Sequence, residues 1–140
     1  MSLENIAVKF KSVDAFSVGN VSALLTEIAA HLEKLIANGE TSVIDLKSLP
    51  FAPGEYEQLR QALGQGEVTA HIEAIGPSEI IETQYPGVWW LTHYNVAGDI
   101  VADIIEIARA PQILQSQPED VHTGLVQLQA TLSQPAAGND

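Results

Sequence analysis

The stretch Pro86-Gly87-Val88-Trp89-Trp90-Leu91-Thr92-His93-Tyr94 decides the fold. A Pro-Gly turn precedes a run of apolar, aromatic and β-branched residues, which is typical of a β-strand. Side chains alternate along a strand, so Trp89 and Trp90 are predicted to point to opposite faces of a sheet. Both can be core side chains only if both faces are covered. The alternative is that one indole is exposed as an anchor for a protein partner, because Trp is enriched at interface hot spots.

The segments around this strand predict an antiparallel sheet. Short β-branched or alternating runs bounded by Gly and Pro predict further strands over residues 41–46, 67–73, 78–83 and 100–107. In the second of these runs, Val68, Ala70 and Ile72 are expected to face inward. Gly98 lies in the connection 95–99, at a position that can take a positive φ, which predicts a hairpin there. The strands after residue 67 are therefore expected to form a meander.

The most strongly periodic helix is predicted to begin at Asn20. Apolar residues recur there every three or four positions and form a wide stripe. Asn20 is expected to be the N-cap, and Gly39 to follow the last turn in a left-handed conformation. The stripe consists of Val21, Leu24, Leu25, Ile28, Leu32, Leu35 and Ile36.

Two further helices are predicted. One is expected to begin at Pro53 and to end at residues 64–66. Its shared face consists of Tyr56, Leu59 and Leu63. The other is expected to begin with a capping box in which Ser116 is the N-cap and Glu119 the N3 residue. Its apolar stripe consists of Val121, Leu125, Leu128 and Leu132.

The predicted fold class is α+β: a largely antiparallel β-sheet with helices packed on one face, in a single domain. The length of 140 residues is typical of one domain. Residues 1–19 are predicted to form an N-terminal arm or strand, residues 20–132 the α+β domain, and residues 133–140 a disordered tail.

Composition and charge exclude several classes of function. Hydrophobic residues make up 46% of the chain and charged residues 17%, which is typical of a globular protein. Asp and Glu number 18 and Lys and Arg 6, so the formal net charge is −12. Binding to nucleic acid or to an anionic membrane needs clustered basic residues, so neither is expected as a partner. A basic partner is compatible with this charge.

The chain contains no cysteine. Disulfides, thiolate nucleophiles and cysteine-held zinc or iron–sulfur sites are therefore excluded, and no cofactor is expected. No run approaches the ~20 apolar residues of a membrane span, and the first residues lack the basic start and apolar block of a signal peptide. These features predict a soluble cytoplasmic protein.

The histidines show no local metal-binding or catalytic motif. His31, His71, His93 and His122 do not occur in a His-x-x-x-His or Glu-x-x-His pattern. His31 lies four residues after Glu27, which predicts a surface pair on a helix. His71 and His93 would meet if their strands were neighbours. A small enzyme, or a metal- or ligand-binding domain that uses these two histidines and strand carboxylates, is therefore an alternative function.

The strand carboxylates are expected to be structural. Glu79 and Glu82 lie on opposite sides of one predicted strand, so they are not expected to act as an acid–base pair. Asp99, Asp103 and Glu106 are expected to form a charged, solvated sheet face. No catalytic residue and no metal ligand is assigned.

A set of short motifs follows one order between about Val21 and Leu132. They are Leu24-Leu25-Thr26-Glu27-Ile28, Gly39-Glu40, Val43-Ile44-Asp45-Leu46 with Ser48-Leu49-Pro50, Leu63-Gly64-Gln65-Gly66-Glu67-Val68, Gly76-Pro77-Ser78-Glu79-Ile80, Pro86-Gly87-Val88-Trp89-Trp90 with His93, Glu106 with Arg109 and Pro111, and Gln117-Pro118-Glu119-Asp120. In these motifs the chain resembles the C-terminal conserved region of the HupH/HyaF family, assembly chaperones of nickel–iron hydrogenases. Members of that family are commonly longer, with an additional N-terminal part.

The resemblance implies a non-catalytic accessory chaperone in nickel–iron hydrogenase maturation. The implied partners are the precursor of the hydrogenase small subunit, which carries the iron–sulfur clusters, and a thioredoxin-fold chaperone that recognises its twin-arginine signal. We expect the partner-binding surface around Glu79, Pro86, Gly87, Trp89, Trp90 and His93. A further alternative is a structural module that forms a homo-oligomer through a sheet edge.

Overall fold

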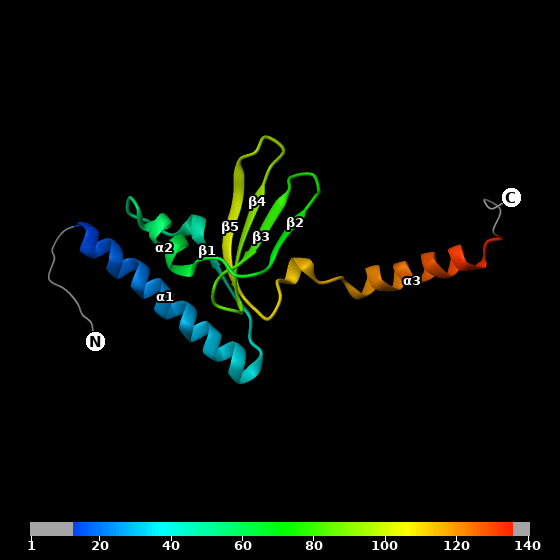
Figure 1. Cartoon of the computed structure of the whole chain (residues 1–140), viewed down its shortest axis with the longest axis horizontal. Helices are drawn as coiled ribbons and strands as arrows, with labels where there is room; N and C mark the ends of the chain where they lie inside the picture. Colours follow the sequence, from blue (N-terminus) through cyan, green and yellow to red (C-terminus); the bar gives the residue numbers. More distant parts are fainter. Residues whose placement is uncertain (1–12, 136–140) are drawn as a thin grey trace. The chain divides into compact units, whose positions relative to one another are not determined.

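The computed structural model describes residues 13–135. Its elements are α1 (Val13–Asn38), β1 (Ser42–Asp45), the 3₁₀ helix η1 (Leu46–Ser48), α2 (Glu55–Leu63), β2 (Thr69–Ile72), β3 (Ser78–Glu82), β4 (Val88–Tyr94), β5 (Ile100–Ile107), η2 (Gln112–Leu114) and α3 (Pro118–Ser133). The predicted α+β class is confirmed (Figure 1). Residues 1–12 of the predicted arm or strand, and residues 136–140 of the predicted tail, lie outside the described residues. The predicted domain limits stay predictions.

The strands form one antiparallel sheet in the order β1-β5-β4-β3-β2. Strands β2 to β5 follow one another as the predicted meander, and β1 pairs with β5 at the other edge. Helix α2 lies between β1 and β2 in the sequence, so it carries the chain from one edge to the other. The central position of β4 explains why all its residues from Val88 to Thr92 are buried.

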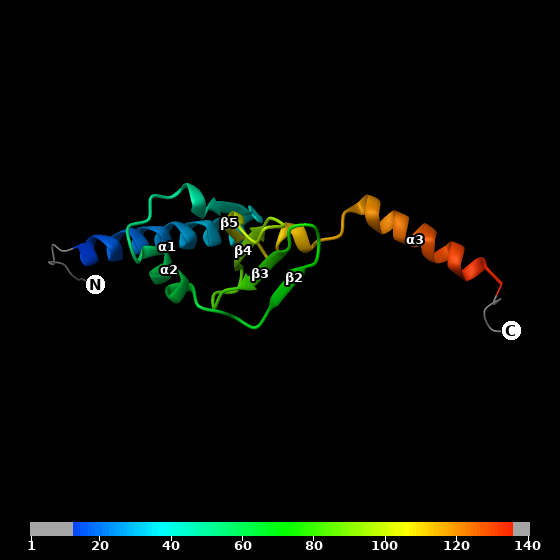
Figure 2. The same ribbon diagram turned by 90° about the horizontal axis from the view of Figure 1, so that it is seen from above.

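The two faces of the sheet carry separate apolar clusters. Trp90 belongs to the cluster that α1 and α2 cover, and Trp89 to the cluster on the other face, as alternation predicts. Figure 2 shows α1 and α2 on the same side of the sheet. The helix-covered cluster consists of Val21, Leu24, Ile28, Ile44, Leu46, Leu59, Leu63, Val88, Trp90, Ile105 and Ile107. The other consists of Ile80, Trp89 and Leu91, with Ala70, Ile72 and Ile104 partly buried against them.

Helix α1 begins at Val13, earlier than predicted. Asn20 lies inside the helix and is not its N-cap, because the preceding Gly19 weakens a helix by only ~1 kcal/mol relative to Ala and does not end it. The predicted role of Gly39 is confirmed, since its φ is 76° and its amide donates to a carbonyl oxygen of the last turn at 2.9 Å. Ile36 is 84% exposed and does not belong to the packed stripe.

Helix α2 begins at Glu55, slightly later than predicted. Pro53 lies in the preceding turn, and the N-cap is Gly54, whose φ of 87° is a left-handed conformation that suits glycine. The two leucines of the predicted face are buried and Tyr56 is half-buried. The helix ends at Gly64, as predicted.

The chain divides after Arg109 into two compact units, and the second contains α3. The predicted capping box is wrong: Gln117, and not Ser116, is the N-cap, because Pro118 takes the first helical position that its fixed φ favours. No residue of α3 is buried, so its predicted apolar stripe is exposed. The exposed fractions are 58% for Val121, 50% for Leu125, 57% for Leu128 and 75% for Leu132. Neither α3 nor another helix within residues 13–135 is long and apolar enough to span a bilayer.

Candidate functional site

The turn before β4 determines where both tryptophans lie. The amide of Val88 donates to the carbonyl oxygen of Tyr85 at 3.0 Å, and Gly87 has a φ of 96°. This is a type II turn with Pro86 in the second position, where its fixed φ fits. A Cβ atom on Gly87 would lie 3.2 Å from Leu32 Cδ2, so α1 packs closely against the turn. Glycine is therefore favoured here both by backbone conformation and by the approach of α1.

Trp90 is part of a buried polar cluster. Its indole Nε1 donates to Asp103 Oδ1 at 2.8 Å, and the same carboxylate accepts from Thr92 Oγ1 at 3.0 Å and from Tyr56 Oη at 2.5 Å. We call these four residues the Asp103 cluster. Burial, and then the hydrogen bond to Asp103, raise the pKa of Tyr56 to about 12. The Arg60 guanidinium lies 4.3 Å from the centre of the Trp90 ring. Asp103 is 3% exposed, so the prediction that it is solvated is wrong.

Trp89 is buried on the other face of the sheet. It is 7% exposed, Trp90 is 3% exposed, and the Nε1 of Trp89 donates to the carbonyl oxygen of Ala108 at 3.0 Å. The prediction of an exposed indole anchor is therefore wrong, and the alternative that both are core side chains is confirmed. Alternation predicts the face that each indole occupies, but not whether that face is covered.

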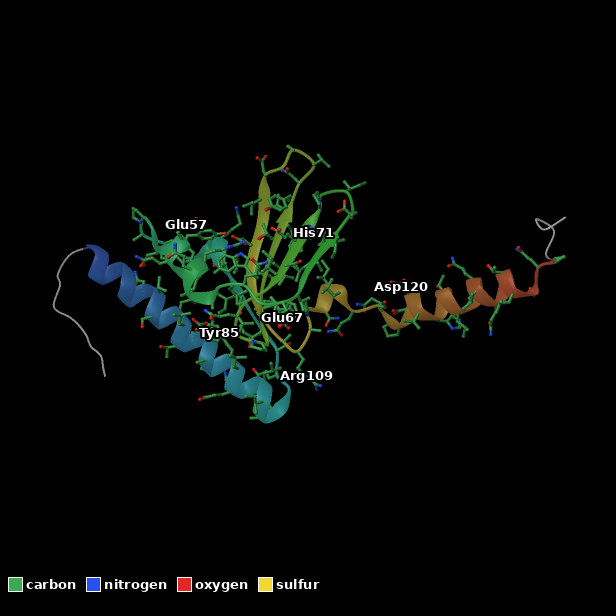
Figure 3. The ribbon with its side chains drawn as sticks, in the orientation of Figure 1. Glu57, Glu67, His71, Tyr85, Arg109 and Asp120 are labelled. Carbon is green, nitrogen blue, oxygen red and sulfur yellow. The ribbon has the colours of Figure 1, made fainter. Side chains whose placement is uncertain are left out.

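His71 and His93 do not meet. Strand β3 lies between β2 and β4, and the register places His71 opposite Glu79 and His93 opposite Ser78. Successive residues of β3 point to opposite faces, so the two histidines do as well. His93 Nδ1 shares a hydrogen bond of 2.5 Å with Ser78 Oγ, whereas His71 is exposed on the edge strand β2 (Figure 3). The predicted pocket shared by these histidines is wrong.

The other titratable groups noted from the sequence are dispersed. Glu27 Oε2 and His31 Nε2 are 3.4 Å apart, which confirms the predicted surface pair. Glu79 and Glu82 lie an odd number of positions apart on β3, on opposite faces as predicted. Glu106 is 7% exposed, so the prediction that it is solvated is wrong. Within residues 13–135, no three His, Asp or Glu side chains are grouped so that they could hold a metal ion.

The residues predicted to bind a partner do not form one surface. Pro86 is exposed, Glu79, Gly87 and His93 are half-buried, and Trp89 and Trp90 are buried. Glu79 and Trp90 lie on the helix-covered face of the sheet, whereas Trp89 and His93 lie on the other. Their part in binding a partner stays a prediction.

A cavity of about 250 Å³ lies between the first half of α1, residues 49–51 and the start of α2. Its wall includes Asn20, Ala23, Leu24, Glu27, Phe51 and Glu55. Glu55 is 1% exposed, its Oε1 accepts from the amide of Ala52 at 2.6 Å, and its Oε2 is buried without a hydrogen-bond partner. Native structures contain few buried polar atoms without a partner, so each needs an explanation.

Sequence reasoning assigned no role to Glu55 and misplaced Asp103. A Glu in the first turn of a helix is ordinary, because it stabilises the positive end of the helix dipole. Its burial depends on the contact of α1 with residues 49–51, which no local pattern reveals. For Asp103 a signal existed, since it shares the side of β5 that carries the apolar Ile105 and Ile107.

Known proteins match most of the chain. Residues 18–134 match the family model described as "HupH hydrogenase expression protein, C-terminal conserved region". The hydrogenase expression/formation protein HoxQ of Azotobacter vinelandii is 30% identical over 98 residues, which is 70% of this chain and 34% of HoxQ. The hydrogenase expression/formation protein HupH of Rhizobium leguminosarum bv. viciae is 28% identical over 101 residues, which is 72% of this chain and 36% of that protein. The chain therefore spans about a third of the length of these curated relatives.

A solved structure is similar as well. The hydrogenase expression protein HupH from Thiobacillus denitrificans ATCC 25259 is 42% identical, with a TM-score of 0.78 over 82% of this chain and 96% of that chain. Sequence and structure thus agree with the resemblance that the Pro-Gly-Val-Trp-Trp motif and its companions predict. The chain belongs to the HupH hydrogenase expression protein family and corresponds to its C-terminal conserved region.

Proposed function

We propose that the chain is a non-catalytic chaperone of nickel–iron hydrogenase maturation that binds the small-subunit precursor, a thioredoxin-fold hydrogenase chaperone, or both. The observation that carries the proposal is the family match over residues 18–134, together with relatives named hydrogenase expression/formation proteins. A role in hydrogenase maturation follows from that membership. The partners and the binding mechanism are the proposed part.

The engagement of polar side chains supports binding rather than catalysis. A general acid or base must reach the reacting group of a substrate. The carboxylate of Asp103 instead accepts three hydrogen bonds from within the core, and His93 bonds to Ser78. His71, which the alternative enzyme hypothesis needs beside His93, lies on the opposite face of the sheet. No acid–base pair among these groups supports the alternative.

Charge supports a basic client. The formal net charge is −12, and an excess of one sign speeds encounter with a partner of the other sign. A precursor with a basic signal region fits this requirement. In this proposal the chain holds the precursor in the cytoplasm before export, and bond-making on the iron–sulfur clusters is left to other proteins.

The predicted contact surface is proposed in a modified form. Pro86, Glu79 and His93 are the members of the predicted set that reach the surface through a side chain. The buried Trp89 and Trp90 would position the turn and β4 without contacting the partner. Substituting either Trp would test folding rather than binding, so Pro86→Ala and Glu79→Gln are the better probes of this surface.

The test is direct binding with purified components. The chain is immobilised, and the small-subunit precursor, the mature subunit without its signal region and the thioredoxin-fold chaperone are passed over it separately. We expect retention of the precursor, of the thioredoxin-fold chaperone, or of both, and weaker retention of the mature subunit. If the folded chain retains none of the three proteins, the proposed function is wrong.

A further inference from the structure

We propose that the cavity beside Glu55 receives a basic side chain, lysine or arginine, of a partner polypeptide. The inference rests on the proposed function only in taking the occupant to be part of a polypeptide client. It assigns a binding residue that lies outside the surface predicted from the sequence.

The carboxyl group of Glu55 lacks a cation. It is almost fully buried, one oxygen accepts from the Ala52 amide at 2.6 Å, and the other has no partner. Among the described residues that line the cavity there is no lysine, arginine or histidine. A buried carboxylate is strongly stabilised when a cation with N–H donors pairs with it. The missing donor must therefore come from outside the chain.

The other walls of the cavity suit a long basic side chain. Leu24 and Phe51 offer apolar surface for its methylene stem, and an aromatic ring also attracts a cation. The side chain of Glu27, 55% exposed, provides a second carboxylate at the rim, and Asn20 provides an amide. The terminal torsion of a Glu side chain is soft, so the Glu55 carboxyl can turn toward an entering cation.

The size of the cavity favours one side chain over a larger ligand. Its volume of about 250 Å³ is below the roughly 300–1,000 Å³ of pockets that enclose drug-sized molecules. The net charge of −12 gives a basic segment a favourable approach. Size, charge and apolar lining thus agree on a single lysine or arginine side chain.

A peptide titration tests the proposal. The probe is the capped tripeptide acetyl-Gly-Arg-Gly-amide, followed by amide chemical shifts of the whole chain. Its control is the same peptide with citrulline, which has nearly the shape of arginine but no charge. We expect saturable shifts at Asn20, Leu24 and Phe51 with the arginine peptide, and weaker binding of the citrulline peptide. Equal binding of the two peptides, or shifts elsewhere only, would overturn the proposal.

Two variants disable the cavity in independent ways. Glu55→Gln removes the charge but keeps an acceptor for the Ala52 amide, and we expect about a tenfold or greater loss of affinity. Ala23→Leu fills the cavity from an exposed position on α1 without changing the charge, and should also abolish binding. Unchanged affinity in both folded variants contradicts the proposal.

Matched controls separate the cavity from general effects of charge and bulk. Glu57→Gln makes the same charge change on an exposed residue of α2 (Figure 3), and Ala30→Leu adds the same bulk on an exposed residue of α1 outside the cavity wall. Both are expected to bind the arginine peptide like the unmodified chain. A loss in either control equal to that of its counterpart would contradict a specific cavity.

The small-subunit precursor distinguishes this inference from the proposed function. Retention of the precursor by the unmodified chain and equally by Glu55→Gln would refute the inference and leave the proposed function intact. Binding of the arginine peptide in the cavity without retention of the precursor or of the thioredoxin-fold chaperone would refute the proposed function and support a cation-binding cavity for another polypeptide.

Discussion

Asp103 and Glu55 are both buried carboxyl groups, with 3% and 1% of their surface exposed, but their partners differ. The two oxygens of Asp103 accept three hydrogen bonds from the core. Glu55 accepts one from a backbone amide and keeps one oxygen without a partner. Burial alone therefore does not separate a structural group from a binding group, whereas the satisfaction of its oxygens does.

The largest expected effect is on the structural side of this comparison. Asp103→Ala leaves the donors of Tyr56, Trp90 and Thr92 without their acceptor, so we expect the free energy of unfolding to fall by about 3 kcal/mol or more. Urea denaturation measures it, with Asp99→Ala in the exposed hairpin as control, for which a change within about 0.5 kcal/mol is expected. A loss below about 1 kcal/mol for Asp103→Ala would contradict a structural role.

The two tryptophans give a matched pair with a smaller effect. Trp90→Phe removes a donor to a carboxylate, worth about 1.5–3 kcal/mol, and Trp89→Phe a donor to a neutral carbonyl, worth about 0.5–1.5 kcal/mol. The loss of ring volume is the same. We expect Trp90→Phe to lower the free energy of unfolding by about 1 kcal/mol more than Trp89→Phe. Equal losses would show that the Asp103 cluster adds nothing beyond packing.

Alkaline pH tests the Asp103 cluster through Tyr56. Its pKa is raised from 10.0 to about 12, so above the unfolded value the folded state binds more protons than the unfolded state. The stabilisation is fully present below pH 10 and is lost as the pH rises toward 12. Unfolding of the unmodified chain and of Tyr56→Phe is compared over this range. The stability advantage of the unmodified chain should shrink; a constant difference contradicts the shift.

The smallest effect on stability is expected at Glu55. Glu55→Gln keeps an acceptor for the Ala52 amide, so the free energy of unfolding should change by less than about 0.5 kcal/mol, or rise. The same chemical denaturation experiment measures it, beside Glu57→Gln. A loss of about 2 kcal/mol would show that the buried oxygen is a structural group after all.

Local patterns predict much of the fold but little of the cavity. The alternation of residues 88–94 predicts that Trp89 and Trp90 lie on different faces, and Gly98 marks the hairpin that follows, with a φ of 89°. Coverage of a sheet face is not local, so the exposure of the indoles was predicted wrongly. Helix starts failed at Asn20 and Ser116, because residue preference for a cap is weaker than continuation of the helix or a proline at its first position.

The candidate cavity depends on contacts that the sequence does not display. Glu55 becomes buried because residues 49–51 and α1 enclose it, although it lies far from α1 in the sequence. The predicted meeting of His71 and His93 failed for the converse reason. Both strands were predicted correctly, but the strand order that separates them is a property of the whole sheet.

The most direct test measures two quantities, free energy of unfolding and affinity for the small-subunit precursor, on Glu55→Gln and Asp103→Asn under conditions in which both variants are folded. Glu55→Gln should keep the stability of the unmodified chain and lose about tenfold or more in affinity. Asp103→Asn should do the reverse, with lower stability and unchanged affinity. Affinity of Glu55→Gln equal to that of the unmodified chain would contradict the division of roles between these two carboxyl groups.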